Sequence, residues 1–493
     1  MKKLFLLLSI GLFLFPAEKT EAQEIKRLTL EEVIKIAEEN SPNAMMARNR
    51  FRASYWQYRT FVAEYRPSLT FTGTTPNYST ALERVWNSQQ EEWYYRSTDV
   101  LRNIGSLSLS QNIGLTGGTI SLNSDLTLEN DFENDKRNYI TAPLSISLNQ
   151  PLFRYNSLKW QKKTEPLKYE TAKKTYLSNM EGVHSQAVMN FFSLALAQIN
   201  TQISAMNYSN SDTLYRMAEG RFQLGTISED ELLQMQLTWL NSQTDRAQAE
   251  MNLRDREIRL RSFLGFNDNV RIELILPSEI PDLQVNPQEV LDMAVANNPE
   301  IMQQQLTLLQ AQSSVAQAKA EKGLNANLVA SFGLRDQDPS FDLAYAQSNQ
   351  QQSIRLGVTL PILDWGLGRG RYKMAQSNLE LTQVQSDQAI RDFEQNLLLD
   401  VDQFNLQAQQ VAIAAKSDTV AMRMYEVTKA RFLIGKIAVL DLNNADTRKD
   451  QNRRAYVQAL QNYWSYFYNI RSLALYDFVN KKPLEVEFES LLD

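Results

Sequence analysis

The chain contains an internal repeat, and this repeat constrains its fold more than any other feature. The word RFQLG, which begins at Arg221, returns as RFLIG at Arg431, 210 residues later. The segments SISLNQPLF and RLGVTLPIL carry Pro151 and Pro361, which are also 210 residues apart. A constant separation over such a distance predicts a tandem duplication with two large structural units.

A second pair of related segments opens each unit. LTLEEVIKIAEENSP ends at Pro42 and VNPQEVLDMAVANNP ends at Pro299, and each reads as a short amphipathic helix. The first unit is longer, because 109 residues separate Pro42 from Pro151 and only 62 separate Pro299 from Pro361. The additional residues must form a loop or further strands. Gly117 and Gly118 are candidates for an extra hairpin turn, so the number of strands stays open at this point.

Both units contain segments in which apolar and polar residues alternate. They include Leu107-Ser-Leu109, Ile120-Ser-Leu122, Leu144-Ser-Ile146-Ser-Leu148 and Ile354-Arg-Leu356-Gly-Val358. A period of two predicts strands with one apolar and one polar face. A soluble sandwich would give the same alternation. Here, however, long helical segments flank the strands and leave no sequence for a second sheet over the apolar face.

Long helical segments follow the strands. Between Ser157 and Arg221, Pro166 is the only proline and Gly182 the only glycine. These 65 residues predict a helix of roughly 97 Å at 1.5 Å per residue. A returning helix is predicted over residues 230–263, with apolar residues at coiled-coil spacing: Leu233, Leu237, Leu240, Ala247 and Met251.

The first 22 residues have the pattern of a secretory signal peptide. Lys2 and Lys3 precede an apolar stretch from Leu4 to Phe15, which is shorter than the ~20 residues that span a bilayer. Ala22 fits the small residue before a cleavage site. We therefore expect residues 1–22 to be removed and the rest to be exported.

Charge and residue content exclude several classes of protein. With 51 basic and 57 acidic residues the net charge is −6, which argues against nucleic-acid binding. The absence of cysteine excludes disulfides, thiolate chemistry and cysteine-ligated metals. The single histidine, His184, lies within a long helical segment and has no cysteine or second histidine to act with. We expect no catalytic residue, no metal site and no cofactor, and so no enzyme.

The RFxxG word lies where a long helix must end and reverse. Gly225 and Gly435 are able to adopt the left-handed conformation that closes a helix, and Arg221 and Arg431 lie in the last turn, where a cation meets the helix dipole. The motif is thus accounted for either as a helix cap alone or as a cap that also forms part of a docking surface.

These features, in this order and twice over, resemble the TolC family of bacterial outer-membrane efflux proteins. The resemblance covers essentially all of the chain after the signal peptide. It implies a mostly α-helical fold with a membrane β-barrel part. Three chains would each give four strands to one shared twelve-stranded barrel in the outer membrane, and long helical hairpins would form a tube through the periplasm of a Gram-negative cell.

The resemblance also implies partners and site residues. A periplasmic adaptor would dock on the hairpin tips and connect them indirectly to an inner-membrane transporter. The implied tip contacts are Arg221, Phe222, Gly225 and Thr226 in the first unit, and Arg431, Phe432, Gly435 and Lys436 in the second. Acidic side chains just after the tips would form the periplasmic gate, at Glu231, Asp441 and Asn444.

The gate departs from the family's pattern in this chain. Gln234 and Asn444 are amides at the second gate position of each unit, and Ile437 replaces a basic residue, with Lys436 beside it. An ionic lock there would therefore differ from the family's. Glu231 and Asp441 are also explained by the preference for acids near helix starts.

The function that the sequence predicts is a passive exit duct that an adaptor opens. Two alternatives are a soluble periplasmic coiled-coil scaffold, which would leave the alternating strands without a partner sheet, and a passive porin, which needs many more strands. We expect a first unit at 23–265, a linker at 266–286, a second unit at 287–479 and a tail at 480–493. Short strands are predicted at Ile272–Leu274 and Leu484–Val486.

Overall fold

The computed structural model describes residues 24–88, 91–266, 270–346, 348–434, 436–437 and 439–492. The predicted signal peptide at residues 1–22 and the tip residue Gly435 lie outside the described residues. The expected segment boundaries at 23–265, 266–286 and 287–479 stay a prediction.

The two repeats fold into helices of matching length, which confirms the duplication. The matching pairs are α1 (Leu30–Asn40) and α5 (Pro287–Asn297) with 11 residues each, α2 (Pro42–Glu64) and α6 (Pro299–Glu321) with 23, α3 (Ser157–Gln223) and α8 (Leu367–Leu433) with 67, and α4 (Glu229–Leu264) and α9 (Val439–Ala474) with 36. The predicted long helices at 157–221 and 230–263 are therefore confirmed to within two residues.

Local side-chain chemistry explains where these helices begin. Thr29 accepts a hydrogen bond from the Glu32 amide, and the Glu32 carboxylate accepts one from the Thr29 amide, which forms a capping box for α1. Asn298 caps α6 through its side chain, which accepts from the Glu300 amide. Pro42 and Pro299 each occupy the first helical position, where a missing N–H costs nothing.

The chain divides into two compact units, and each unit takes segments from both repeats. The helical unit comprises the described part of Met1–Met46, Met180–Gln284 and Gln403–Asn469. The sheet unit comprises Ala47–Asn179, Val285–Asp402 and Ile470–Asp493, of which the last residue is not described. The boundaries of the two compact units therefore differ from the boundaries of the two sequence repeats.

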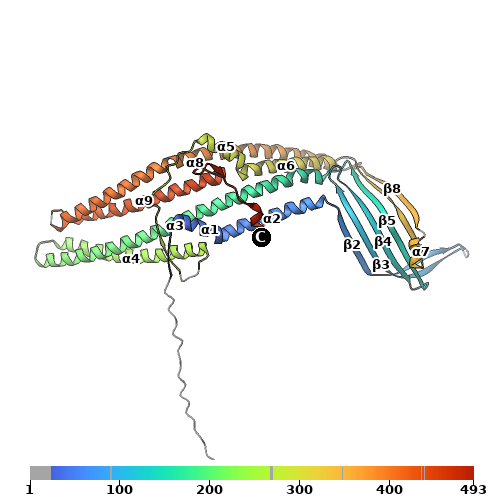
Figure 1. Cartoon of the computed structure of the whole chain (residues 1–493), viewed down its shortest axis with the longest axis horizontal. Helices are drawn as coiled ribbons and strands as arrows, with labels where there is room; N and C mark the ends of the chain where they lie inside the picture. Colours follow the sequence, from blue (N-terminus) through green and yellow to red (C-terminus); the bar gives the residue numbers. More distant parts are fainter. Residues whose placement is uncertain are drawn as a thin grey trace, which may run out of the picture. The chain divides into compact units, whose positions relative to one another are not determined.

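The helical unit is held together by an apolar core that draws on helices of both repeats. Fully buried side chains include Val33 on α1, Phe191 and Phe192 on α3, Leu260 on α4 and Tyr463 on α9. The Tyr463 hydroxyl donates a 2.6 Å hydrogen bond to the Pro281 carbonyl, which satisfies its polar end. Figure 1 shows the hairpins α3–α4 and α8–α9, whose tips belong to this unit.

A short parallel strand pair completes the helical unit. β1 (Glu24–Leu28) pairs with β6 (Val270–Leu274) over five residues. The predicted strand at Ile272–Leu274 is confirmed within β6. Ile272 is buried, and Gln198 of α3 donates to its carbonyl at 2.6 Å, which ties the strand pair to the long helix.

The sheet unit contains one antiparallel sheet in the order β2-β3-β4-β5-β7-β8 (Figure 1). Its strands are β2 (Ser68–Asn87), β3 (Glu92–Ile113), β4 (Gly118–Asp131), β5 (Lys136–Leu152), β7 (Asn325–Asp338) and β8 (Asn349–Thr359). The implied four strands per chain are corrected to six, because the longer first unit folds into the additional hairpin β3–β4. Its turn includes Gly117 at a φ of 76°.

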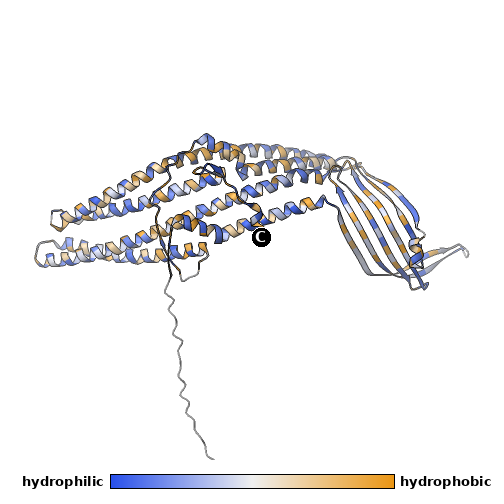
Figure 2. Cartoon of the chain, viewed as in Figure 1, coloured by the Kyte–Doolittle hydropathy of each residue, from blue (hydrophilic) through white to orange (hydrophobic). Residues whose placement is uncertain are grey.

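The two faces of this sheet differ in polarity, as the alternation predicts. Leu109 lies opposite Leu122, and Ile146 lies opposite both Leu122 and Phe332, so one face is apolar across the strands. Figure 2 shows the alternation along each strand. On the other face, serine hydroxyls pair across neighbouring strands: Ser68 with Ser110, Ser121 with Ser147 and Ser331 with Ser353, at 2.6–2.9 Å.

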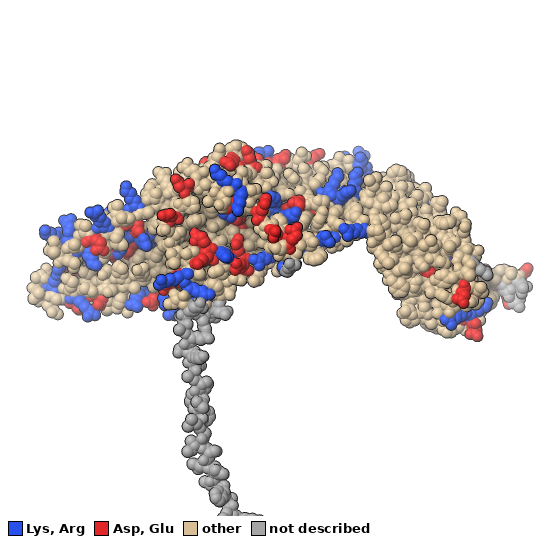
Figure 3. Space-filling model, viewed as in Figure 1, with Lys and Arg blue, Asp and Glu red and all other residues tan. Residues whose placement is uncertain are grey.

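Charged side chains on the sheet gather at one end of the strands. Figure 3 shows few charges along the sheet and a cluster near its far end. There Arg102 pairs with Glu129 at 2.7 Å and Arg96 lies 3.9 Å from Asp131. The short helix α7 (Phe341–Ala346) lies at the same end, where the Thr141 hydroxyl donates to the Ala344 carbonyl.

The predicted strand at Leu484–Val486 is wrong in its position. The structure places a two-residue pair at β9 (Tyr476–Asp477) and β10 (Lys482–Pro483) instead. Asp477 accepts hydrogen bonds from the Val479 and Asn480 amides at 3.0 Å and so closes a tight turn. This turn makes the strand pair form before Leu484. Among the described residues, no helix is long and apolar enough to cross a bilayer.

Candidate functional site

The first hairpin tip ends α3 with a glycine cap. Gly225 has a φ of 73°, and its amide donates to the Phe222 carbonyl at 2.8 Å. The Thr226 amide donates to the Arg221 carbonyl at 2.9 Å, which closes the helix end. The Thr226 hydroxyl donates to the same carbonyl at 2.9 Å. The helix-cap interpretation of RFxxG is thus confirmed at this tip.

The second tip closes by an equivalent hydrogen bond. The Lys436 amide donates to the Arg431 carbonyl at 3.0 Å, as the Thr226 amide does to Arg221. Arg221 and Arg431 lie in the last turns of α3 and α8, where a cation stabilises the helix dipole. The repeated motif therefore gives a repeated backbone ending.

The two phenylalanines of the motif lie in different environments. Phe222 is 41% exposed, whereas Phe432 is only 7% exposed. Phe432 belongs to a buried cluster with Tyr425, Leu442 and Ala445, and Leu214 of α3 packs against it. Its side chain therefore holds the second hairpin to the first instead of facing a partner.

A cavity of about 210 Å³ brings residues of both tips together within the helical unit. Arg221, Thr226 and Glu231 of the first hairpin line it, as do Phe432 and Ile437 of the second. Ile437 also packs on the cluster that contains Phe432. Ile437 therefore contributes to packing at the position where the resemblance implies a basic residue.

The predicted gate residues lie on the exposed surface of the first turns after the tips. Glu231 is the third residue of α4, and Ser228 caps this helix by accepting from the Glu231 amide at 3.3 Å. Asp441 is the third residue of α9. Glu231, Asp441 and Asn444 all face solvent in the single chain. Acids in a first turn also stabilise the helix dipole, so both explanations for them stay open.

Sequence reasoning missed the most exposed apolar residues of the tips. Leu224 is 79% exposed and Ile434 is 65% exposed. They occupy the same position of the two motif copies, one residue before the glycine. An apolar residue repeated at a solvent-facing turn is the sequence signal that makes them candidates for a contact surface.

A buried ion cluster lies behind the second tip and links the hairpins. Lys449 Nζ lies 2.6 Å from Asp446 Oδ1 and 3.3 Å from Asp450 Oδ1, and 4.1 Å from the centre of the Tyr425 ring. Asn207 of α3 donates to Asp450 at 2.8 Å. Burial lowers the pKa of Lys449, but the hydrogen bond and charge of Asp446 outweigh it and raise that pKa overall.

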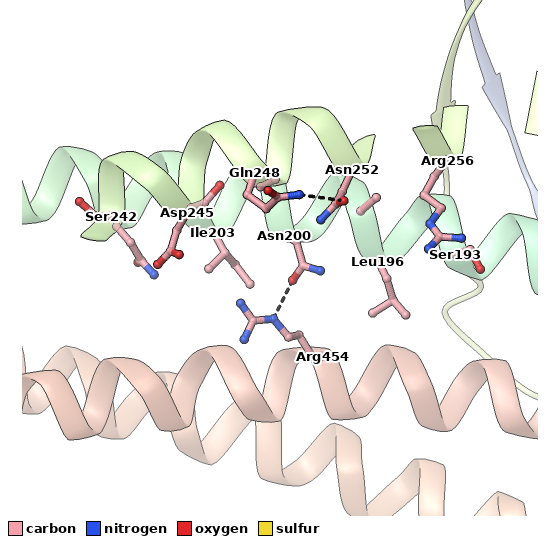
Figure 4. Close-up of a pocket in the computed structure, with 14 residues that line it drawn as sticks. Ser193, Leu196, Asn200, Ile203, Ser242, Asp245, Gln248, Asn252, Arg256 and Arg454 are labelled. Carbon is pink, nitrogen blue, oxygen red and sulfur yellow. Dashed lines mark hydrogen bonds between the residues drawn. The ribbon is translucent and has the colours of Figure 1, made fainter. Parts of the chain in front are cut away.

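Farther along the hairpins, a polar groove separates α3 and α4 from α9. Arg454 of α9 donates to Asn200 of α3 at 2.6 Å across this groove, as Figure 4 shows. Asp245, Gln248 and Asn252 of α4 line the same groove. Polar contacts of this kind can exchange with water, so the hairpins are less tightly joined here than in the apolar core.

Comparison with known protein families identifies the family of this chain. The family model described as outer membrane efflux protein matches residues 33–266 and 290–474, which is most of the chain and one match per repeat. The chain belongs to the outer membrane efflux protein family. Members of this family are transport channels, and the chain is an outer-membrane exit duct of an efflux system, not an enzyme. Its place is the outer membrane, with the helical part extending into the periplasm.

Solved structures with the same fold agree with this family assignment. The Campylobacter jejuni CmeC outer membrane channel has a TM-score of 0.66 at 15% identity, over 94% of this chain and 88% of that chain. The outer membrane protein VceC from Vibrio cholerae has a TM-score of 0.61 at 13% identity, over 92% of this chain and 97% of that chain. At such low sequence identities, these similarities show a shared fold.

A third similar structure is the open state of the Neisseria gonorrhoeae MtrE outer membrane channel. Its TM-score is 0.53 at 14% identity, over 93% of this chain and 91% of that chain. Comparison with curated protein sequences finds no significant match. The family assignment therefore follows from the family model, and the solved structures add the shared fold.

Proposed function

We propose that three copies of this efflux-family chain assemble into a passive conduit, docked at its hairpin tips by a periplasmic adaptor. One observation supports this most strongly. Within the described part of the sheet, β2 and β8 each have a strand on only one side. Unsatisfied backbone groups cannot face lipid, so the sheet must close with other copies.

Exposed apolar side chains on the helices also support assembly. On α4, Leu233, Leu237 and Leu240 keep their coiled-coil spacing and face solvent in the single chain. On α8, exposed apolar residues recur every seven residues within the helical unit: Leu406, Ile413, Val420 and Val427. A seven-residue apolar stripe needs a partner helix, which a neighbouring copy would supply.

Adaptor docking is supported by the composition of the tips. Leu224 and Ile434 expose apolar side chains, and each lies three residues after the motif arginine, so each tip carries an apolar and a basic residue close together in sequence. Phe222 and Thr226 complete the first tip, whereas Phe432 supports the second from behind. An inner-membrane transporter would act on the conduit only through the adaptor.

The gate proposal depends on the acids after the tips. Glu231 and Asp441 project from the first turns of α4 and α9, so three copies would carry six such carboxylates around the entrance. Their charge would favour cations at the entrance. Opening would move the hairpins apart, which the polar groove crossed by Arg454 and Asn200 resists less than the buried cluster around Phe432 does.

The assembly is tested by the mass of the purified mature chain in detergent. Native mass spectrometry should give a trimer, and removal of detergent should give precipitation. A stable monomer that stays soluble without detergent would exclude the conduit and favour a periplasmic scaffold. Photocrosslinking from Leu224 in cells should capture a protein that mass spectrometry identifies as a periplasmic adaptor. Met251, exposed on α4, is the control position, and it should capture no adaptor.

The gate is tested by single-channel recording in planar bilayers. The double variant Glu231→Lys with Asp441→Lys should reduce cation preference and change conductance. Glu229→Lys with Glu426→Lys makes the same charge change at nearby exposed positions and serves as the control. Equal behaviour of both double variants would remove Glu231 and Asp441 from the gate.

A further inference from the structure

The sheet contains two strands that the second repeat lacks. Helix α2 corresponds to α6 with an offset of 257 residues, which aligns the start of β2 at Ser68 with the start of β7 at Asn325. The offset of 210 residues aligns Pro151 at the end of β5 with Pro361 just after β8. Strands β3 and β4 therefore have no counterpart in the second repeat, and they lie between β2 and β5 in the sheet.

Strands β3 and β4 are interior strands of the sheet, not edge strands. β3 pairs with β2 along Ser68–Asn87, and β4 pairs with β5 from Thr119 to Asp131. On the polar face the Ser108 hydroxyl donates to Asn123 at 2.6 Å, between β3 and β4. The apolar face also continues across them, because Leu109 of β3 pairs with Leu122 of β4.

From this integration we propose that each chain places six strands in the membrane ring, so that the trimer closes as an eighteen-stranded barrel. The proposal rests on the trimer proposed above and goes beyond it in the number of strands. A ring with four strands per chain would require β2 to pair with β5 directly, as β7 pairs with β8. That pairing is prevented here because β3 and β4 occupy the space between them.

The repeat also predicts how neighbouring copies join. Inside one chain, β5 meets β7 where the first repeat's last strand pairs with the second repeat's first strand. Between copies, β8 should meet β2 in the equivalent way. The internal pair Asn149–Val329 then translates, by the two offsets, into Thr359 of one copy opposite Thr72 of the next.

The predicted register also keeps each face of the sheet continuous across the joint between copies. The internal pair Leu148–Ala330 translates into Val358 opposite Gly73. Val358 pairs with Ala326, which lies on the apolar face of β7, so Val358 lies on that face too. Gly73 is on the same face of β2 as Phe71. Thr72 and Thr359 both fall on the polar face. A register wrong by one residue would place apolar and polar faces together.

Both edge strands carry apolar side chains that are left uncovered in a single chain. Phe71 on β2 is 71% exposed and Ile354 on β8 is 81% exposed. Joining the two edges places such residues in one continuous lipid-facing band. The barrel diameter grows roughly linearly with strand number, so eighteen strands give a mouth about 1.5-fold wider than twelve.

Cysteine crosslinking tests the joint, and the chain suits it because it has no cysteine of its own. Thr72→Cys with Thr359→Cys places the two thiols opposite each other in neighbouring copies, within the Cα separation of roughly 4.5–5.5 Å that a disulfide accepts. In one chain these positions are five strand spacings apart, about 24 Å along the sheet. Thr72→Cys with Val358→Cys is the control, because its thiols lie on opposite faces.

Oxidation of the test variant in native membranes should give a covalent trimer on denaturing gels, and the control should stay monomeric. A crosslinked monomer would show that one chain closes its own ring, which overturns the proposal. The absence of any trimer, with or without crosslinking, would remove the proposed conduit itself.

Electron microscopy of the trimer in lipid nanodiscs tests the strand number separately. The full-length mature chain should show a barrel about 1.5-fold wider than a variant that lacks residues 83–134, which removes β3, β4 and the end of β2 and leaves four strands. A full-length trimer with eighteen resolved strands supports the proposal even if the deletion variant does not fold. A trimer with twelve strands would leave the conduit intact and exclude the eighteen-stranded ring.

Discussion

His184 Nε2 lies 2.7 Å from Glu38 Oε1 in the helical unit, which joins α3 to α1. Its Nδ1 lies 3.4 Å from Glu181 Oε1, and the Tyr468 ring packs edge-on at 5.4 Å. Burial lowers the pKa of His184, but the hydrogen bonds and charges of Glu181 and Glu38 outweigh burial and raise the pKa to about 9. The single histidine of the chain is therefore a structural cation.

This pair makes stability depend on pH in a defined direction. The folded pKa of about 9 exceeds the unfolded value of 6.5, so the stabilisation is complete below pH 6.5 and is lost as pH rises towards 9. His184→Gln should lower the unfolding free energy by about 1–3 kcal/mol at pH 6 and by much less above pH 9. Thermal unfolding of both proteins at the two pH values checks this. An equal loss at both would show that His184 contributes only through packing.

The buried lysine behind the second tip should be sensitive to loss of its charge. Lys449→Met removes the ion-pair partner of Asp446 and Asp450, which should cost about 3–5 kcal/mol of stability. The triple variant Lys449→Met, Asp446→Asn, Asp450→Asn removes all three charges and should recover most of that loss. The melting temperature of each variant in detergent is the measurement. Failure of the triple variant to recover would mean that Lys449 acts through its contact with Tyr425.

The two motif phenylalanines offer a matched pair of substitutions. Phe432→Ala empties a buried site and should lower stability by about 3–5 kcal/mol. Phe222→Ala should change stability little and should weaken adaptor crosslinking from Leu224 instead. Melting temperature and crosslinking yield are measured for both variants. If Phe222→Ala lowers the melting temperature of the trimer as much as Phe432→Ala does, Phe222 packs against a neighbouring copy.

The first tip should tolerate asparagine better than alanine at its glycine. Gly225 has a φ of 73°, and a Cβ there meets no atom within 4 Å, so only the backbone conformation opposes substitution. Gly225→Ala should cost about 1–2 kcal/mol locally, whereas Gly225→Asn should cost less because asparagine adopts this conformation more readily. Amide hydrogen exchange over residues 220–231 reports the loosened cap. If both variants exchange as slowly as the unchanged protein, the tip does not need a residue that favours the left-handed conformation.

The sequence alone determined the features that depend on local patterns. Equal offsets for RFxxG and for Pro151 and Pro361 gave the duplication, and the capping glycine at Gly225 was predictable because left-handed backbone favours glycine whatever surrounds it. Period-two alternation likewise identified the strands and their two faces. Helix ends followed from capping residues and prolines, whose effects extend over only one turn.

Only the tertiary structure decided which copy of a repeated residue is buried and how many strands share one sheet. Phe222 and Phe432 stand in nearly identical words, yet Phe432 packs on Leu214 while Phe222 faces solvent. Alternation predicted strands within β3 and β4, at Leu107–Leu109 and Ile120–Leu122, but the number of strands in the sheet stayed open because nothing local says which strand each would pair with. Burial and strand pairing are contacts between residues far apart in the chain, so a local pattern can permit them without choosing among them.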